Sequence, residues 1–264
     1  MTQAFQDVAG EVVVGGLLSG IDVDGGPTSE QLAVLFALGT HYLGCQHLDL
    51  TSIQRVDPQQ LAQVLVNPSD RRRFHHLHVA LESARHPQTS AQVAAVEHFA
   101  EALHVDGPDL VMFRSLVTSG VEQAAADYRR FVEHVLPLRA EPTLARVDVG
   151  LSEPEPELLA RLQGFSELPE GSLGRALLAF YERTGLNVPG SDPARMNHFS
   201  VAHDMTHVIA GIGTSSPGEI ALSGFMVAMD DNEVNFSALL SSLIIHEAGF
   251  GRPPSTAPKW RPFL

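Results

Sequence analysis

The chain has 264 residues, 44% of them hydrophobic, and can bury a sizeable core as one large domain or two small ones. It has 17 basic and 31 acidic residues, a formal net charge of −14. This negative charge argues against nucleic-acid binding and against docking on an anionic membrane. Cys45 is the single cysteine, so no intramolecular disulfide forms. We find neither a run of about 18 apolar residues nor a signal peptide and expect a cytoplasmic protein without a transmembrane segment.

Helical patterns dominate the first half of the chain. The triplet Val12-Val13-Val14 favours a strand locally, but no partner strand is in sight and we predict a buried helix. Apolar residues at helical spacing predict a helix over 28–44, capped by Thr28 or Ser29 and ended by Gly44. Similar patterns predict further helices over about 58–66, 70–85, 90–104, 109–118 and 121–136.

One basic run, Arg71-Arg72-Arg73, is followed closely by His75, His76 and His78. Charge runs of this kind usually lie on solvated helix faces, and we predict such a face here. A metal site on these histidines is the alternative, since His75 and His78 are three residues apart. No carboxylate or thiol completes it nearby, so the solvated face is favoured.

A stretch rich in proline and glutamate, 137–156, predicts a linker. Helical patterns resume beyond it, and the proline-rich tail from Gly251 is predicted to be irregular. The predicted helices cover about 157–164, 171–185, 196–213, 217–229 and 233–248. The fold class predicted from the whole pattern is all-α, in two helical units.

Two acidic turns give the first part a faint internal repeat. Ile21 to Pro27 and Leu103 to Pro108 each join a helix end, an Asp-Gly turn and a new helix start. This layout resembles the TerB-like family of helical domains associated with tellurite resistance, which implies a TerB-like domain over 1–136. The resemblance further implies that the turns can hold a metal at Asp22, Asp24 and Asp106. Ordinary turn chemistry is the favoured reason for these aspartates.

The sharpest signal lies at His203, Asp204, His207 and Glu219. His203 and His207 are four residues apart and share one helix face, and Asp204 is rotated from His203 by only about 100°. The Gly211–Gly213 turn lets the chain reverse so that Glu219 can return to the same side. Imidazoles with carboxylates suit a divalent metal, Zn first and Fe, Mn or Co as alternatives. We therefore predict a metal site on these four residues.

A helix cap and a phosphohydrolase site are the alternatives for these residues. Ser216-Pro217-Gly218-Glu219 fits a capping box with proline at the first helical position, which would account for Glu219 without a metal. It does not account for the histidines, because burying such polar groups in an apolar segment without a shared partner is costly. An HD-type phosphohydrolase would need a further downstream aspartate. Only Asp230-Asp231 offers one, and that pair is predicted to be a polar helix end.

The segment His203-Asp204-Met205-Thr206-His207, followed after eleven residues by Glu219, resembles the HDxxH-x11-E motif of the Coq4 family of quinone-biosynthesis proteins. Leu168 to Ala176 is similar to a second segment of that family, and Gly218 to Leu222 fits its pattern around the glutamate. The stretch before the His203-Asp204 pair, Asn197 to Ala202, differs from the pattern of that family. The resemblance implies a Coq4-like metal-binding helical domain over 157–264. It also implies a hydrophobic aromatic or quinone-type ligand, isoprenoid in many members, and oxidative decarboxylation with hydroxylation at the same carbon.

We expect Arg175 near an anionic group of such a substrate, because a guanidinium binds a carboxylate bidentately; a surface ion pair with Glu170 or Glu182 is the alternative. A metal-stabilised lipid-binding or scaffold protein without catalysis is the second hypothesis. In that hypothesis the TerB-like half would bind a partner. For the protein in general, a homo-oligomer or a biosynthetic protein complex is a further expectation. Apolar residues of 171–185 and 233–248 line a lipophilic cleft in the first hypothesis and are plain core in the second. These are Leu177, Leu178, Phe180, Leu239, Leu240, Leu243 and Ile244.

Overall fold

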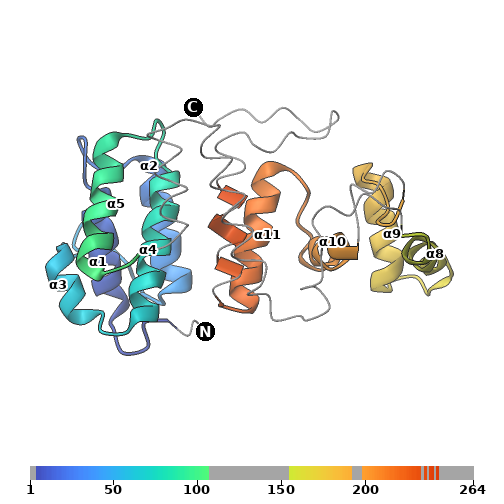
Figure 1. Ribbon diagram of the computed structural model, residues 1–264, viewed down its shortest axis with the longest axis horizontal. Coiled ribbons are helices and arrows are strands. Elements are labelled where there is room, and N and C mark those ends of the chain that lie inside the picture. Colours follow the sequence, from blue (N-terminus) through green and yellow to red (C-terminus); the bar gives the residue numbers. More distant parts are fainter. Residues whose placement is uncertain are drawn as a thin grey trace. The chain divides into compact units, whose positions relative to one another are not determined.

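The computed structural model describes residues 4–106, 155–191 and 198–232, with 235, 236, 238–240, 242 and 243. Every regular element among them is a helix, so the all-α prediction is confirmed. The elements are α1 (Gly10–Ile21), α2 (Ser29–Ala37), the π-helical η1 (Leu38–Tyr42), α3 (Pro58–Val64), α4 (Pro68–Ser83), α5 (Ser90–Leu103), α8 (Pro156–Gln163), the 3-10 turn η3 (Gly164–Glu167), α9 (Leu173–Thr184), α10 (His198–Ala210) and α11 (Ser216–Met229) (Figure 1).

Some predictions lie outside the described residues. These are the helices expected over 109–118 and 121–136, the linker except for its last two residues, and the tail. Among the described residues, no helix combines the length and the apolar character needed to cross a membrane.

The chain divides into two compact units. The first contains the described residues up to 106 and those from Met226 onward, and the second contains those from 155 to Phe225. The sequence-based boundaries at 136 and 157 put residues 226–243 in the second domain. In the structure, the buried side chains of this segment pack in the core of the first unit; they are Val227, Phe236 and Leu240. Nothing in the sequence around 226 signals a boundary, because α11 continues through it as one helix.

Capping side chains begin helices α2 to α5 of the first unit. Thr28 and Gln31 form a reciprocal capping box at α2, and Asp57 and Gln60 form another at α3. The helix predicted over 28–44 is confirmed as far as Ala37, and the chain then continues in the wider turn of η1. Helices α1, α2, α4 and α5 lie side by side (Figure 1).

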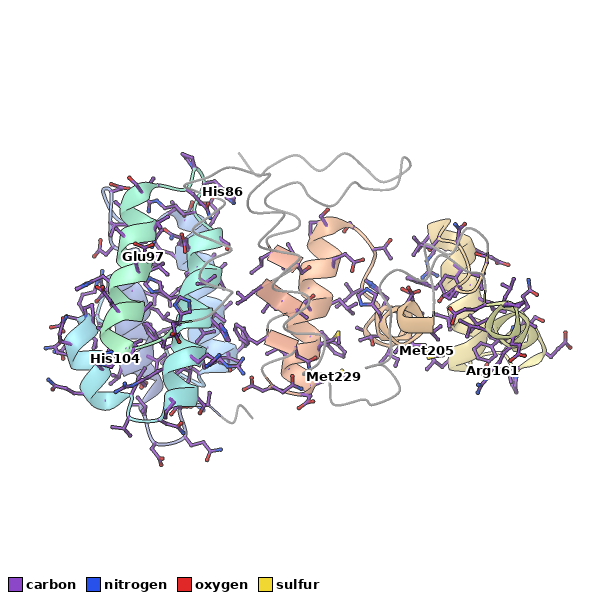
Figure 2. All side chains as sticks on the ribbon, in the orientation of Figure 1. His86, Glu97, His104, Arg161, Met205 and Met229 are labelled. Atoms are coloured by element: carbon purple, nitrogen blue, oxygen red, sulfur yellow. The ribbon has the colours of Figure 1, made fainter. Side chains whose placement is uncertain are left out.

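Helix α1 supplies much of the core of the first unit. Val13, Val14, Leu17 and Ile21 are fully buried there, so the valine triplet is in a buried helix as predicted. α5 packs on α3 and α4 and ends at Leu103. The residue that follows, His104, labelled at the lower end of this helix in Figure 2, has a left-handed backbone (φ 53°).

The solvated face predicted for the basic run of α4 holds at Arg72, which is exposed, and is wrong for Arg73 and the histidines. Arg73, His75, His76 and His78 are all buried. Arg73 forms an ion pair of 2.9 Å with Asp231 and lies 4.2 Å above the ring of Phe236. Residues distant in the sequence therefore cover this face, and a local sequence pattern cannot predict such contacts.

The second unit has a smaller core between α8, α9 and α10. Its fully buried members are Leu162, Leu177, Phe180 and Tyr181. Met205 of α10, labelled in Figure 2, packs against them. This core fixes the position of α10 against α9, and α10 carries the two histidines of the predicted site.

Candidate metal centre

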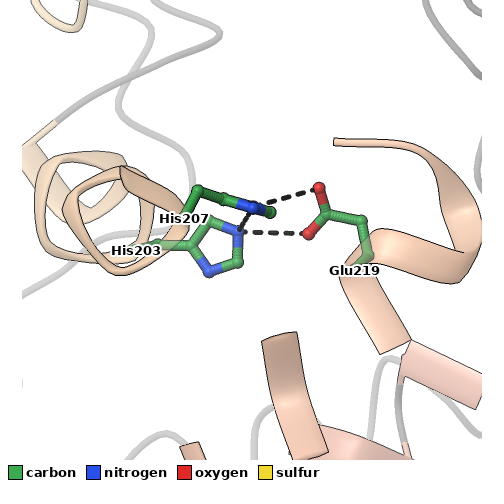
Figure 3. A group of neighbouring side chains, drawn as sticks. All are labelled: His203, His207 and Glu219. Carbon is green, nitrogen blue, oxygen red and sulfur yellow. Dashed lines mark hydrogen bonds and ion pairs between the residues drawn. The ribbon is translucent and has the colours of Figure 1, made fainter. Parts of the chain in front are cut away.

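Three of the four predicted ligands meet in the second unit. The Nε2 atoms of His203 and His207, one turn apart on α10, lie 3.2 Å from each other (Figure 3). The carboxylate of Glu219, from the first turns of α11, lies 3.2 Å from His203 Nε2 through Oε2 and 3.3 Å from His207 Nε2 through Oε1. Within the described part of the chain this is the one group of three or more ligand-type side chains close enough to hold a metal.

The separation of the two imidazole nitrogens matches an edge of a coordination polyhedron. Ligand atoms at about 2.0–2.1 Å from a tetrahedral metal lie about 3.3 Å from one another. The two nitrogens lie 3.2 Å apart, and each lies 3.2–3.3 Å from a different oxygen of Glu219, so that one atom from each of the three residues falls within 4.8 Å of the others. Two nitrogens and a carboxylate oxygen are also a ligand set that Zn and non-haem Fe use in proteins. The residues therefore fit a divalent metal in both spacing and chemistry.

The end of α10 fixes the orientation of His207. Gly211 adopts a left-handed conformation (φ 69°), and the N–H of Ile212 donates to the carbonyl of His207 at 3.2 Å, as in a Schellman motif. The carbonyl of Ile212 in turn accepts from Nδ1 of His207 at 3.0 Å. Since a carbonyl cannot donate, Nδ1 carries the proton and Nε2 of the neutral ring offers its lone pair to the site.

The ring of His207 is also held from its side. Phe180 of α9 stacks on it with centroids 5.6 Å apart and an interplanar angle of 21°. The buried side of the site is therefore built by a rigid aromatic contact and a backbone hydrogen bond. Both hold Nε2 in place before any ion arrives.

A tight turn brings Glu219 to the histidines. Ser215 Oγ accepts from the N–H of Gly218 at 3.3 Å, and the carbonyl of Ser215 accepts from the N–H of Glu219. The helix begins at Ser216, so the prediction of Ser216 as the cap is wrong by one residue. A Cβ on Gly218 would collide with the carbonyl of Gly213, which shows how closely the turn folds back. Glu219 is thereby free of the capping role and faces the imidazoles.

Charges within the site stabilise one another. Burial alone would raise the pKa of Glu219, but the hydrogen bonds with His203 and His207 lower it to about 2. Burial opposes a charge on His207, yet the hydrogen bond and negative charge of Glu219 outweigh it and raise the pKa of His207 above its ordinary value. Without a cation, a proton on His207 therefore offsets the carboxylate charge.

The structure places Asp204 differently from the other three. Asp204 is 3% exposed, and its carboxylate accepts a hydrogen bond of 2.9 Å from the hydroxyl of Tyr181 on α9. It is not part of the converging group. Burial raises the pKa of Asp204, which the hydrogen bond from Tyr181 partly counteracts. Burial and the charge of Asp204 raise the pKa of the Tyr181 phenol, which remains a donor.

The site is open on one side. The side chain of His207 is 1% exposed, whereas those of Glu219 and His203 are 26% and 43% exposed. An ion held by all three would be backed by protein behind His207 and reachable from solvent past His203. This is the arrangement of a site that keeps a coordination position for an external ligand.

The sequence did not point to Tyr181, Phe180 or Ile212 as parts of the site. A signal for Tyr181 exists: it shares the apolar stripe of α9 with Leu177 and Phe180, and a buried tyrosine hydroxyl usually has a hydrogen-bond partner. That the partner is Asp204 depends on the packing of α9 against α10. The role of the Ile212 carbonyl depends on backbone geometry alone.

The other predicted site residues lie elsewhere. Asp22 pairs with Arg55 at 3.1 Å, and Asp22, Asp24 and Asp106 do not form a ligand group within the described residues. Arg175 is exposed and donates to the carbonyl of Ser166 at 2.6 Å.

The residues predicted to line a lipophilic cleft belong to two different units. Leu177 and Phe180 belong to the core of the second unit, and Leu239, Leu240 and Leu243 pack in the core of the first. Ile244 lies outside the described residues. An amphipathic helix has the same apolar stripe whether that stripe packs in a core or lines a cleft, so the sequence pattern cannot distinguish the two.

Comparison of the chain with known protein families, with curated proteins and with solved structures gives no match.

Proposed function

We propose that this chain is a metal-dependent protein that binds one divalent ion at His203, His207 and Glu219 and presents it to an external ligand. The observation that carries the proposal is the convergence of His203, His207 and Glu219, each imidazole Nε2 lying 3.2–3.3 Å from a carboxylate oxygen and 3.2 Å from the other Nε2, with His207 fixed from behind. Two imidazoles with a carboxylate favour Zn. Fe, Mn and Co use the same ligand types and are the alternatives.

A bound divalent metal would polarise an oxygen of a ligand or lower the pKa of a bound water. The chain itself holds the imidazole of His207 with its lone pair toward the site, supplies one negative charge through Glu219, and leaves the side next to His203 accessible. Such a site can bind and activate a small molecule that carries a carboxylate or phenolate oxygen.

The resemblance of the motif to the Coq4 family supports a more specific substrate class. We propose a hydrophobic aromatic or quinone-type molecule as the substrate, with oxidative decarboxylation and hydroxylation as the reaction. The ring carboxylate would leave as CO2 and a hydroxyl would take its place, which requires a two-electron oxidant such as dioxygen and, since Zn has no redox chemistry, the alternatives Fe, Mn or Co in the site. Arg175 would bind the anionic group of this substrate. A cytoplasmic location is part of the same proposal.

A metal-stabilised scaffold or lipid-binding protein is the second candidate. The packing of the expected cleft residues in the two cores favours the scaffold form of this candidate. In that case the metal would cross-link α10 and α11 without meeting a substrate.

Metal analysis of protein purified without added metal tests the proposal. We expect about one divalent ion per chain in the parent protein and a loss of it in His203→Ala and His207→Ala, together with a lower melting temperature, because bound metal stabilises the folded state. His98→Ala, an exposed histidine of α5, is the matched control and should retain the ion. Stoichiometric metal in both site variants would place the site elsewhere and refute the assignment.

Titration of the Co²⁺-loaded protein with azide separates the two candidates. A change in the visible spectrum on azide binding is expected for the open site of an enzyme. A spectrum that does not respond at any azide concentration would favour the closed site of a scaffold.

A further inference from the structure

A hydrogen bond turns Asp204 away from the metal ligands. Asp204 follows His203 directly on α10, and its rotation of about 100° per residue points it toward α9. There the hydroxyl of Tyr181 donates to its Oδ2 at 2.9 Å. Both side chains are 3% exposed. The carboxylate is therefore satisfied by the core of the second unit and not by the site.

A buried carboxylate needs such a partner. Leaving it without a hydrogen bond or a counter-ion is costly, and Tyr181 provides the donor from a rigid position, since its ring lies beside Phe180 with centroids 5.7 Å apart. Without that donor, a cation held by the neighbouring His203 together with His207 and Glu219 would attract the carboxylate of Asp204. The hydroxyl of Tyr181 thus competes with the metal for Asp204.

We propose that Tyr181 is a positioning residue that keeps Asp204 off the metal and so keeps a coordination position open for an external anion. This inference rests on the proposed function, because it requires a metal at the three-residue site. With Glu219 as the one carboxylate ligand, a divalent ion retains a net charge of +1, which favours an anionic oxygen ligand such as a carboxylate or phenolate. A second carboxylate from Asp204 would neutralise that charge and fill the position.

Three variants of the full chain test the proposal, each loaded with Co²⁺ and titrated with azide as the anionic probe. Tyr181→Phe removes the donor and retains the ring. Asp204→Asn removes the charge of the competing ligand. The double variant combines both, and Tyr42→Phe is the matched control, because its hydroxyl also donates to an aspartate, Asp231 at 3.0 Å, but lies in the first unit.

We expect Tyr181→Phe to weaken azide binding by about tenfold or more and to change the Co²⁺ spectrum, because Asp204 enters the coordination sphere. Asp204→Asn should change metal affinity by less than about tenfold, since no ligand is lost. The double variant should recover azide binding, which a purely structural effect of losing the hydroxyl would not allow. Tyr42→Phe should behave like the parent protein.

Two results would overturn the inference while leaving the proposed function intact. One is azide binding by Tyr181→Phe equal to that of the parent, and the other is a loss of metal by Asp204→Asn as severe as that of His203→Ala, which would make Asp204 a ligand. If Tyr181→Phe does not fold, Asp204→Asn alone decides between ligand and non-ligand. A parent protein that binds no Co²⁺ would instead refute the proposed function.

Discussion

At the scale of single residues, the site depends on Glu219 as a ligand and not as a helix cap. Ser215 supplies the hydroxyl that accepts from the first turn of α11, while both carboxylate oxygens of Glu219 face histidine nitrogens. The two roles therefore belong to two different residues. They can be separated by substitution.

Glu219→Gln keeps the shape of the side chain and removes the negative charge. We expect it to weaken metal affinity severely, because a neutral amide oxygen is a far poorer ligand for a divalent cation. Ser215→Ala should do the reverse and cost about 1 kcal/mol of folding stability with metal affinity retained. Metal titrations and chelator-treated melts of both variants measure the two effects. Equal metal affinity of Glu219→Gln and the parent would reduce the ligands to the two histidines.

The protonation of His207 gives the site a pH dependence with two opposite signs. Glu219, with a pKa near 2, stays ionised across the neutral range, so His207 is the group that exchanges a proton for the metal. The pKa of His207 lies above the ordinary 6.5, so protons begin to compete with the metal at a pH higher than 6.5. Below that pH, metal affinity should fall by about tenfold per pH unit for one proton.

The metal-free protein should behave oppositely. A histidine whose folded pKa is raised stabilises the fold below its unfolded pKa, and this stabilisation is lost as the pH rises through the folded pKa. Melts of chelator-treated protein between pH 6 and 9 should therefore show a falling melting temperature, while competition titrations show rising metal affinity. Metal affinity that stays constant from pH 8 to 6 would contradict the assigned role of His207.

At the scale of elements, the helices themselves were predictable and their ends were less so. Apolar periodicity located the cores of α2, α3, α9 and α11, because burial of one helix face imposes that period. The cap of α11 was placed one residue late, since Ser215 and Ser216 are equally good caps by type. The burial of Arg73 and the pairing of Tyr181 with Asp204 were missed, because each depends on a partner from another helix.

The turn between α10 and α11 decides whether Glu219 reaches the histidines. Gly218→Ala would place a Cβ against the carbonyl of Gly213 and force the turn open. We expect it to cost about 1–3 kcal/mol of stability and to weaken metal binding.

Gly224→Ala, on the same helix, is the matched control. Its Cβ would meet nothing within 4 Å, so the change should be neutral or stabilise the helix by roughly 0.5–1 kcal/mol. Unfolding and metal titrations of the two variants provide the comparison. A Gly218→Ala protein that matches the control in both would show that the turn does not position Glu219.

At the scale of the whole molecule, the first unit is completed by residues from the far end of the chain. Asp231 pairs with Arg73 at 2.9 Å and accepts from the hydroxyl of Tyr42 at 3.0 Å. Five residues later, Phe236 stacks on His76 with centroids 5.5 Å apart and lies beneath the guanidinium of Arg73. The histidines and arginine that look like a solvated face in the sequence are thus the docking surface for a segment some 150 residues away.

This arrangement makes Asp231 a stability determinant of α4 although it is distant in sequence. The side chains of Asp231 and Arg73 are 9% and 10% exposed, and removal of one partner of a buried ion pair leaves the other charge uncompensated, at a cost of about 3–5 kcal/mol. We expect that loss for Asp231→Ala, with faster amide hydrogen exchange in α4 and α1. Asp230→Ala is the control, because Asp230 is exposed and its carboxylate accepts from the nearby Asn232. Its free energy of unfolding should stay within about 0.5 kcal/mol of that of the parent.

Urea unfolding combined with hydrogen exchange at individual helices measures the effect in each unit, since a single global transition is not expected of a two-unit chain. Equal protection of α4 in both variants would mean that the segment after α11 does not hold the first unit together.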